Sequence, residues 1–393
     1  SAENEYWQHV AVTYDATSTS NDPTFYFNGS AVTSITETGT PVGTYSSDSS
    51  QDAAIGNTPT PVSSERGFDG HIDELRVSNI VRSEDWINQT FQMVSYPDEY
   101  VETSEEISRP YYYLPDDSFE RCANIFIKNA GSSTLENFPA YLHVEYQEGM
   151  VPNFLDLRFK DDSCGNEAPL LDYEMEYHLR KSHADIWVRI PSLATTGKTI
   201  SMYYQNTSAV SSGENPTGVW DENYVLVYHL QEEGVDDNFY DSTSYATHGT
   251  QENFGGSGSN INATDGAVGG SVIFDGVDDR IALSSPSQLD NLEQRTVEAW
   301  IMPDSYGGIG YGRIFDKSSS TATADGWSFM VVDSHSGDSV KSLRFVQAFS
   351  DTGGSWNSAD NLIFADPNSA ENEYWQHVAV TYDATSTSND PTF

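Results

Sequence analysis

The sequence is poor in cysteine and in basic residues, and it has no long apolar run. Its 393 residues include two cysteines and 18 Lys and Arg against 60 Asp and Glu, which gives a net charge of −42. We therefore expect no nucleic-acid partner, because so acidic a surface would repel phosphates rather than neutralise them. The longest apolar run, residues 224–230, is far too short to span a bilayer, so we expect no membrane insertion in this segment.

Short motifs that mark common catalytic centres are also missing. The sequence contains no HExxH, no GxSxG and no glycine-rich phosphate loop. Glu174 and Glu176 are spaced to share one face of a strand, but such a pair is usually only solvated, and glycosidases need two carboxylates that face one bond. We predict that the protein is not an enzyme.

What the sequence does contain is typical of short strands and turns. Aromatic residues make up 12% of the chain, with 23 Tyr and 18 Phe, which is too many for a disordered polymer. Apolar and polar residues alternate in many short segments, and no long segment has the 3.6-residue period of a helix. This pattern predicts an all-β sandwich or jelly roll.

One stretch occurs twice. Residues 369–393 repeat residues 1–25 without a change, at an offset of 368 residues. Both copies contain WQHVAVTYD, whose alternation predicts a half-buried strand. A self-match at a fixed offset indicates a tandem repeat, in which one domain begins near residue 219 and finishes near residue 96 of the next copy. Strand donation between separate subunits and a cloning artefact are the alternatives.

Several strand motifs follow one another in an order that resembles a known family. The series is SVIFDGVDDRIAL (271–283), TVEAWI (296–301), GWSFMV (326–331), LRFV (343–346), WQHVAVTYD, FYFNG (25–29) and GFDGHIDELRVSN (67–79). It resembles the laminin-G-like, concanavalin A-like jelly roll over residues 214–368 and 1–94. A break in the alternation at Asp73 and Glu74 interrupts the last of these strands.

A second group of alternating segments resembles a different module. Residues 118–209 carry DLRF, IWVRIP and MYYQN, and they resemble an uncharacterised β-sandwich module of bacterial and archaeal surface proteins, which has no known chemistry. The predicted fold is all-β, a concanavalin A-like jelly-roll sandwich alternating with a smaller β-sandwich in a tandem repeat. The expected divisions are the C-terminal part of one jelly roll (1–94), a linker (95–117), the small sandwich (118–209), a linker (210–222) and the N-terminal part of the next jelly roll (223–393).

The laminin-G-like resemblance implies a Ca²⁺ cofactor held by loop aspartates at the rim of the sandwich. The matching positions are Asp241, Asp73, Asp275 and Asp278, with Asp241 and Asp73 as the preferred pair. The strongly acidic composition agrees with a cation partner, since Ca²⁺ prefers carboxylate and carbonyl oxygens. The alternative is that the Asp-Gly sequences in FDGVDD only form tight turns.

Other candidate sites depend on the protein being exported. A disulfide between Cys122 and Cys164 is then expected, with two free thiols as the alternative. The sequons at Asn28, Asn88, Asn206 and Asn262 are candidate glycosylation sites. Most tryptophans lie in alternating segments and are expected in the core, while Trp356, in GGSWNSAD, is the best candidate for an exposed platform that stacks on a sugar.

Together these features predict an extracellular or cell-surface protein. The main hypothesis is a repeat unit of a structural or adhesive filament or stalk, stabilised by calcium, whose partners are identical repeats or chains and glycans. An array of carbohydrate-binding modules is the alternative, and a sugar-dependent change in tryptophan fluorescence would favour it. An extracellular hydrolase is a third hypothesis, for which we find no carboxylate pair.

Overall fold

The protein divides into two compact units. The larger comprises Ser1–Arg82 and Asn223–Phe393, and the smaller comprises Ser83–Glu222. The computed structural model describes residues 8–13, 16, 18–59, 65–105, 107–108, 119–209, 211–231, 238–255, 258–263, 266–319, 325–333, 342–359 and 376–383.

The first sheet of the larger unit combines strands from both ends of the chain. Strand β6 is its central element, because β21 pairs along one edge while β19 and β15 pair along the other. In order across the sheet, the described strands are β18 (Asn260–Ala263), β19 (Ser271–Asp275), β6 (Asp69–Ser78), β21 (Gln294–Pro303), β26 (Gln376–Asp383), β1 (Gln8–Thr13), β2 (Thr24–Phe27) and β3 (Ser30–Ala31), with β15 (Tyr224–Tyr228) beside β6.

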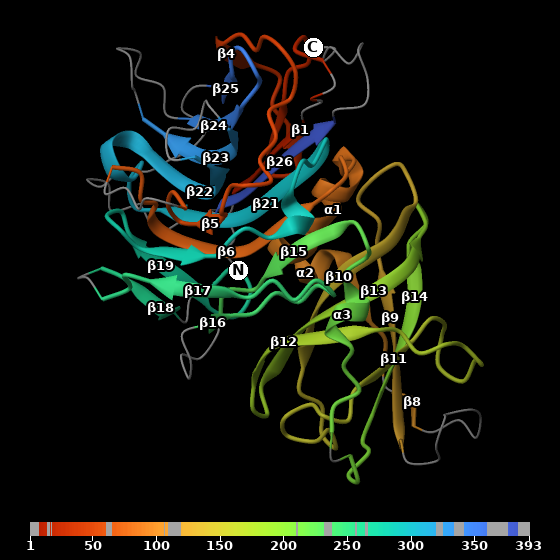
Figure 1. Cartoon of the computed structure of the whole chain (residues 1–393). Helices are drawn as coiled ribbons and strands as arrows, with labels where there is room; N and C mark the ends of the chain where they lie inside the picture. The colour runs from red at the N-terminus through yellow and green to blue at the C-terminus, as the bar shows by residue number, and fades with distance from the viewer. Residues whose placement is uncertain are drawn as a thin grey trace. The chain divides into compact units, whose positions relative to one another are not determined.

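The second sheet of the larger unit is antiparallel throughout its described strands. Strands β22 to β25 follow one another side by side (Figure 1). The order is β16 (Asn238–Phe239), β17 (Gly249–Glu252), β20 (Arg280–Ala282), β5 (Ala54–Ile55), β22 (Tyr311–Ser318), β23 (Gly326–Val332), β24 (Ser342–Gln347), β25 (Gly354–Ser358) and β4 (Ile35–Gly39). Two single 3-10 turns, η1 (Ser287–Leu289) and η2 (Gly308–Gly310), lie in the connections.

One hydrophobic core joins the two sheets of the larger unit. Alternate residues of each strand face it, for example Leu75 and Val77 of β6 and Trp327 and Phe329 of β23. The rings of Trp327 and Phe315 stack at 5.0 Å between centroids. This face-to-face packing of two sheets is the all-β sandwich that the alternating pattern predicts.

Two local features of the larger unit follow from its backbone conformation. Glu74 has a φ of 50°, and the register between β6 and β21 shifts at this point, so the break in alternation is a β-bulge. Asn28 and Gly29 both have positive φ, 51° and 76°, in the tight turn between β2 and β3.

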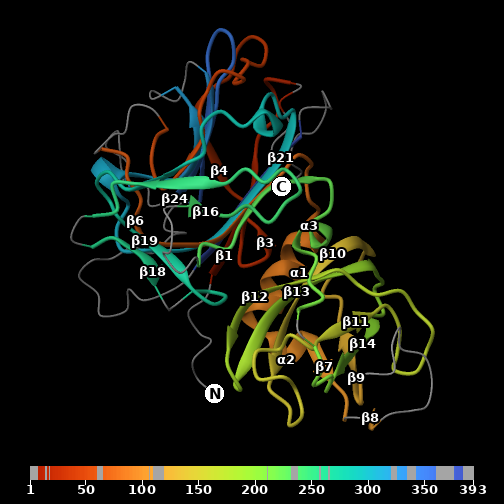
Figure 2. The same ribbon diagram turned by 60° about the horizontal axis from the view of Figure 1, so that its bottom comes forward.

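The smaller unit is a second, separate β-sandwich. Figure 2 shows β10 (Leu135–Glu145), β13 (His183–Leu193) and β12 (Tyr173–Leu179) side by side in its three-stranded sheet. The other sheet has the order β11 (Arg158–Lys160), β14 (Lys198–Tyr204), β9 (Arg121–Ile127) and β7 (Val101–Thr103), with β8 (Ile107–Ser108) also paired to β9.

The boundary between the units differs from the prediction. Helix α1 (Glu84–Ser95) was expected in the jelly roll, but it packs within the smaller unit. The ring of Trp86 lies 4.9 Å from that of Phe138, and the Gln89 side chain bonds both the Lys128 carbonyl and the Ala130 N–H. Ser83 caps the helix by accepting a hydrogen bond from the Trp86 N–H, as its position in the sequence indicates.

The two expected linkers also contribute to the smaller unit. Residues 97–103 form the short helix α2 (Pro97–Tyr100) and strand β7, which pairs with β9. Most of 106–117 lies outside the described residues. The second linker contains helix α3 (Pro216–Val219), and Trp220 after it donates to the Glu174 carboxylate at 2.8 Å. Composition alone is a poor guide here because acidic, proline-bounded segments can still pair as edge strands.

Cys122 and Cys164 form a disulfide that ties β9 to the loop after β11, with their Cα atoms 6.0 Å apart. Cys122 is buried beside Phe119 and Tyr203. The backbone N–H of Cys164 also donates to the side chain of Asn124 in β9, at 2.7 Å. The bridge and this hydrogen bond therefore hold the loop that contains Cys164 against β9.

We predict that Cys122→Ala/Cys164→Ala destabilises the smaller unit by about 4 kcal/mol, because the bridge closes a 42-residue separation. Chemical denaturation of the oxidised wild type, the reduced wild type and the double variant measures this loss. Reduction should have the same effect as the substitutions and no effect on the double variant. Equal stability of oxidised and reduced wild type would contradict the prediction.

Candidate metal centre

A four-residue turn at one end of the larger sandwich gathers three carboxylates. It connects β19, which ends at Asp275, to β20, which begins at Arg280. Asp275 Oδ1 accepts a hydrogen bond from the Val277 N–H at 2.9 Å, and the Asp275 N–H donates to Asp279 Oδ2 at 2.8 Å. Gly276 adopts a φ of 75°, and a Cβ there would lie 2.9 Å from Cβ of Asp69.

Asp275, Asp278 and Asp279 each offer one oxygen within 4.8 Å of the others. Asp279 is only 1% exposed, and its Oδ1 is buried without a hydrogen-bond partner among the described residues. Burial is the main cause that raises the pKa of Asp279 to about 6; the charges of Asp275 and Asp278 act in the same direction, and hydrogen bonds from the Asp275 N–H and the Ser259 side chain act against it. A buried, unpaired carboxylate oxygen facing two other carboxylates is an arrangement that a cation would stabilise.

The spacing of these oxygens suits calcium. Calcium ligands lie at roughly 2.3–2.6 Å, so two oxygens on opposite sides of one ion are about 5 Å apart. Three carboxylates can supply part of the six to eight oxygens that the ion prefers, with carbonyls and water supplying the rest. Asp275 and Asp278 were predicted ligands, whereas Asp279 was not. The sequence did contain an indication of this third ligand, because Asp279 directly follows Asp278.

Asp241 has a different role from the one predicted. Its carboxylate accepts hydrogen bonds from the N–H groups of Val227, Thr243 and Thr247 and from the Thr243 hydroxyl, at 2.8–3.0 Å. Burial raises its pKa, while these hydrogen bonds favour the charged form. Asp241 therefore holds the 241–248 loop against β15, and its lone pairs are engaged by the protein itself.

Asp73 likewise bonds the backbone. Its two carboxylate oxygens accept from the N–H groups of Glu74, at 2.8 Å, and Val268, at 3.0 Å. Among the described residues, the clusters of three potential metal ligands include neither Asp73 nor Asp241. The preferred pair is thus replaced, as a candidate centre, by the turn at 275–279. Sequence spacing could not reveal this because backbone donors compete with a cation for the same oxygens.

The prediction of an exposed aromatic platform at Trp356 is wrong. This side chain is fully buried in β25, stacks on Phe345 with 6.3 Å between centroids, and donates its Nε1–H to Asp22 at 2.8 Å. The neighbouring glycines and serines suggested a loop, yet the segment pairs with β24 and β4 as an interior strand. Every tryptophan whose side chain the structure describes is buried.

The candidate glycosylation sites lie in different surroundings. Asn28 and Asn88 are half-buried, in the turn after β2 and in helix α1 respectively. Asn206 is only 8% exposed and its side-chain oxygen accepts from the Ser208 N–H, so the structure argues against a glycan there. The side chain of Asn262 lies outside the described part of the chain.

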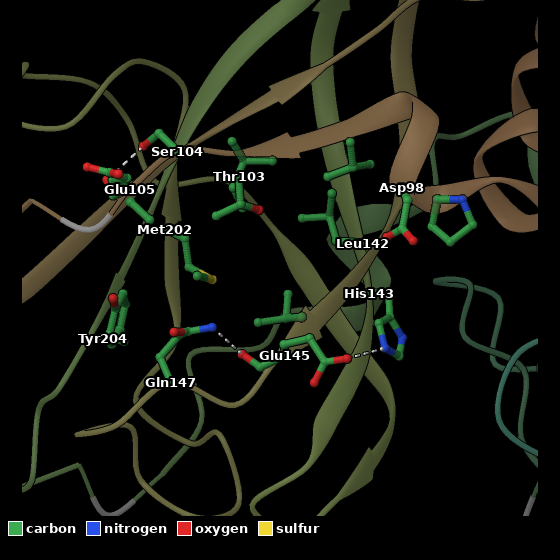
Figure 3. A pocket seen from close by; sticks show the side chains of 15 residues that line it. Asp98, Thr103, Ser104, Glu105, Leu142, His143, Glu145, Gln147, Met202 and Tyr204 are labelled. Atoms are coloured by element: carbon green, nitrogen blue, oxygen red, sulfur yellow. Dashed lines mark hydrogen bonds and ion pairs between the residues drawn. The ribbon is translucent and has the colours of Figure 1, made fainter. Parts of the chain in front are cut away.

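The smaller unit contains a cavity of about 450 Å³ that sequence reasoning missed (Figure 3). Its walls come from both sheets, with Leu142 and Met202 among the apolar residues. Polar groups lie at its edge, where His143 is within 3.5 Å of Glu145 and 2.7 Å of Asp185. The hydrogen bond to Asp185 raises the pKa of His143. The charged groups of the described lining therefore include a contact between His143 and Glu145.

The larger unit is an all-β jelly-roll sandwich with an acidic turn at its rim. The chain belongs to the concanavalin A-like lectin/glucanases superfamily, whose sequence model matches residues 1–88 and 275–389, more than half of the chain. This confirms the predicted family resemblance. A domain of unknown function, DUF2341, matches residues 153–245, which covers the C-terminal half of the smaller unit and continues into the larger one.

No curated protein and no solved structure matches the chain. Domains of the laminin-G type are typically extracellular, non-catalytic, and used in adhesion or carbohydrate binding. Within the described residues, every helix is too short or too polar to cross a membrane.

We predict that Ca²⁺ stabilises the protein through Asp279. At a hundredfold excess over its Kd, Ca²⁺ should add about 2.7 kcal/mol to the free energy of unfolding. Asp279→Asn should abolish this gain, as measured by denaturation with and without Ca²⁺. The matched control is Asp241→Asn, which should cost roughly 1–3 kcal/mol in hydrogen bonds and still retain the gain. Loss of the gain in both variants, or in neither, would contradict the assignment.

The raised pKa of Asp279 predicts a pH dependence in the absence of Ca²⁺. The folded state holds the proton up to about pH 6, whereas the unfolded chain releases it near the ordinary value of 3.8. The contribution to stability is therefore complete below about pH 4 and is lost as the pH rises to 6, by roughly 1–3 kcal/mol. The difference between wild type and Asp279→Asn, measured at several pH values with a chelator, isolates this group. A difference that is constant across this range would refute the prediction.

Proposed function

We propose that this chain is a repeat unit of a secreted or cell-surface protein that forms a stalk or adhesive filament and is stabilised by calcium. Each period would contain one jelly roll and one smaller sandwich. The observation that carries the proposal is the unchanged recurrence of residues 1–25 at 369–393. A repeat array places identical domains along one chain, so weak contacts add together without new binding sites.

The way in which the jelly roll is assembled supports a repeat that crosses the domain. Its first sheet needs β6 and β2 from the N-terminal part and β21 and β26 from the C-terminal part. Strand β26 pairs with β2 at Thr381 and Val380, opposite Thr24 and Phe25. In a tandem array, β26 of one period would lead directly into β2 of the next, with the same pairing.

Charge and calcium are consistent with this role. A net charge of −42 keeps neighbouring chains apart at low salt, and divalent cations would reduce that repulsion. The turn at 275–279 gives each jelly roll one place where a cation would relieve unpaired negative charge. Calcium would then stiffen each domain and favour close approach of acidic faces.

The carbohydrate-binding alternative is less well supported. It was based on an exposed tryptophan, and the candidate Trp356 is buried in the core. Carbohydrate binding is a general property of the superfamily to which the chain belongs. In the described part of the chain, however, we find no group of aromatic side chains that favours a sugar-binding site.

The intact mass of the denatured, reduced native protein tests the array. We predict a mass of many multiples of the 368-residue period, because the two copies would then belong to successive periods of one polypeptide. The sequence in hand has a mass of 43.4 kDa. A native mass near that value would overturn the covalent array, and the jelly roll would then close within a single period.

A further inference from the structure

The cavity of the smaller unit lies along the free edges of two strands (Figure 3). Among the described strands, β10 ends the order of the three-stranded sheet and β7 ends the order of the other sheet. The lining includes four consecutive residues of β10, 142–145, together with Val101 and Thr103 of β7. Because successive side chains of a strand point to opposite faces, a consecutive run shows that the cavity meets β10 at its edge.

Backbone groups of β10 point into this gap. The Tyr146 N–H donates to the Ser182 carbonyl at 2.7 Å, in the same register as β10 and β13. Hydrogen-bonded pairs alternate along an antiparallel ladder, so His143 and Glu145 direct their N–H and C=O groups to the free edge. The Glu145 carbonyl accepts a long bond of 3.4 Å from Gln147 Nε2. This side-chain amide takes the place that the backbone N–H of a neighbouring strand would have.

The first half of the same edge is protected. Pro139 also occupies an outward position of the ladder and has no N–H to offer. Helix α1 packs on this half of the strand, where Trp86 contacts Phe138. Natural sheets protect their edges by such means. Residues 143–145 contain no proline, and their edge opens into the cavity instead.

The cavity combines an apolar floor with an acidic rim. The floor consists of buried side chains from β9, β14 and β10, namely Ala123, Ile125, Met202, Tyr204, Leu142 and Val144. The rim has the exposed carboxylates of Asp98, Glu105 and Glu145, and the basic side chain in the described lining is His143. The volume of about 450 Å³ is typical of ligand pockets. Charge at the rim therefore favours a cationic occupant.

We propose that this cavity, which we call the peptide groove, binds an extended, basic segment of another protein. The segment adds a strand to the free edge of β10 and exchanges backbone hydrogen bonds with His143 and Glu145. Apolar side chains at every second position cover the floor, and lysine or arginine side chains between them meet the rim carboxylates. Strand β10 is the partner because it has eleven residues and β7 only three. A second copy of this chain is excluded as the occupant by the net charge of −42.

Synthetic peptides test the groove in the full chain. We expect acetyl-Lys-Val-Lys-Val-Lys-amide to bind with one-to-one stoichiometry in isothermal titration calorimetry. The same peptide with glutamate in place of lysine should bind at least about tenfold more weakly, because its charge has the sign of the rim. Equal binding of the two peptides, or binding of neither, would overturn the proposal.

Methylated peptides separate strand pairing from simple filling of an apolar cavity. Only every second N–H of an added strand points to its partner. Methylation of the backbone nitrogens of the valines, or of the lysines, should therefore abolish binding in one peptide and leave it nearly unchanged in the other. Equal effects of the two methylations would contradict pairing with a strand edge.

Ala123→Leu tests whether the lysine peptide binds in the groove or elsewhere on the acidic surface. The larger side chain fills the floor without changing any charge. We expect binding to weaken by about tenfold or more, while the Tm falls by less than about 3 °C because the added volume enters an existing cavity. Unchanged binding by a folded Ala123→Leu variant would show that the peptide binds outside the groove.

A matched pair of proline variants identifies the strand that accepts the peptide. Glu145→Pro removes an outward N–H of β10, and Thr103→Pro removes one of β7, since the Ser104 N–H beside it donates to the Asn124 carbonyl. Glu145→Pro should abolish binding, and Thr103→Pro should leave it unchanged. Glu145→Gln, which removes the charge alone, should weaken binding only severalfold.

Loss of binding in Thr103→Pro but not in Glu145→Pro would refute pairing with β10. Circular dichroism shows whether each variant folds, and the methylated peptides decide the question of pairing if the Glu145→Pro variant does not. These results are independent of the native mass, which tests the repeat array.

Discussion

The backbone of β21 requires a hydrogen-bonded strand along its open edge, and the jelly roll depends on filling that position. Strands β6 and β21 carry much of one wall of the core, including Leu75, Val77, Val297 and Ile301. If the edge of β21 were unpaired, its N–H and C=O groups would be left for other chains to pair with. Strand β26 supplies the partner and connects this wall to β2. The sheet is therefore complete only when distant segments meet.

Because of this constraint, the first sheet of the jelly roll depends on the strand in the repeated segment, although that segment is only 25 residues long. A strand in the middle of a sheet bonds two neighbours at once, so its loss separates the sheet into two parts. The N-terminal part, with β2 and β6, and the C-terminal part, with β21, are each incomplete without the other. A domain divided in this way folds only when both parts are present. In a tandem repeat, both parts are present at each junction between successive periods.

Electrostatics adds a second, local constraint. The turn at 275–279 brings three carboxylates together because backbone hydrogen bonds from Val277 and Asp275 hold it in shape. The result is a raised pKa at Asp279, since burial and like charge both oppose ionisation. Asp241 is also buried, but three donors of its own loop and the Val227 N–H of β15 bond both of its carboxylate oxygens.

The smaller unit is organised by packing rather than by charge. Helix α1 covers β10 through Trp86, and the disulfide holds the loop after β11 against β9. Its cavity lies between the two sheets where apolar side chains from β10 and β14 do not fill the space. The acidic composition of the segment before β9 gave no sign that this segment adds a strand to the sheet.

The sequence by itself determined the all-β class, the two modules and the break in alternation at Glu74, because each depends on periodicity or on residues a few positions apart. The tertiary structure decided which carboxylates meet, where Trp356 lies and which unit takes α1 and the expected linkers. Those outcomes depend on contacts between distant segments, such as Asp241 with Val227 or Trp356 with Asp22. The local sequence pattern cannot specify these contacts. Whether a carboxylate oxygen accepts a hydrogen bond or is available to a cation depends on donors that lie far away in the sequence.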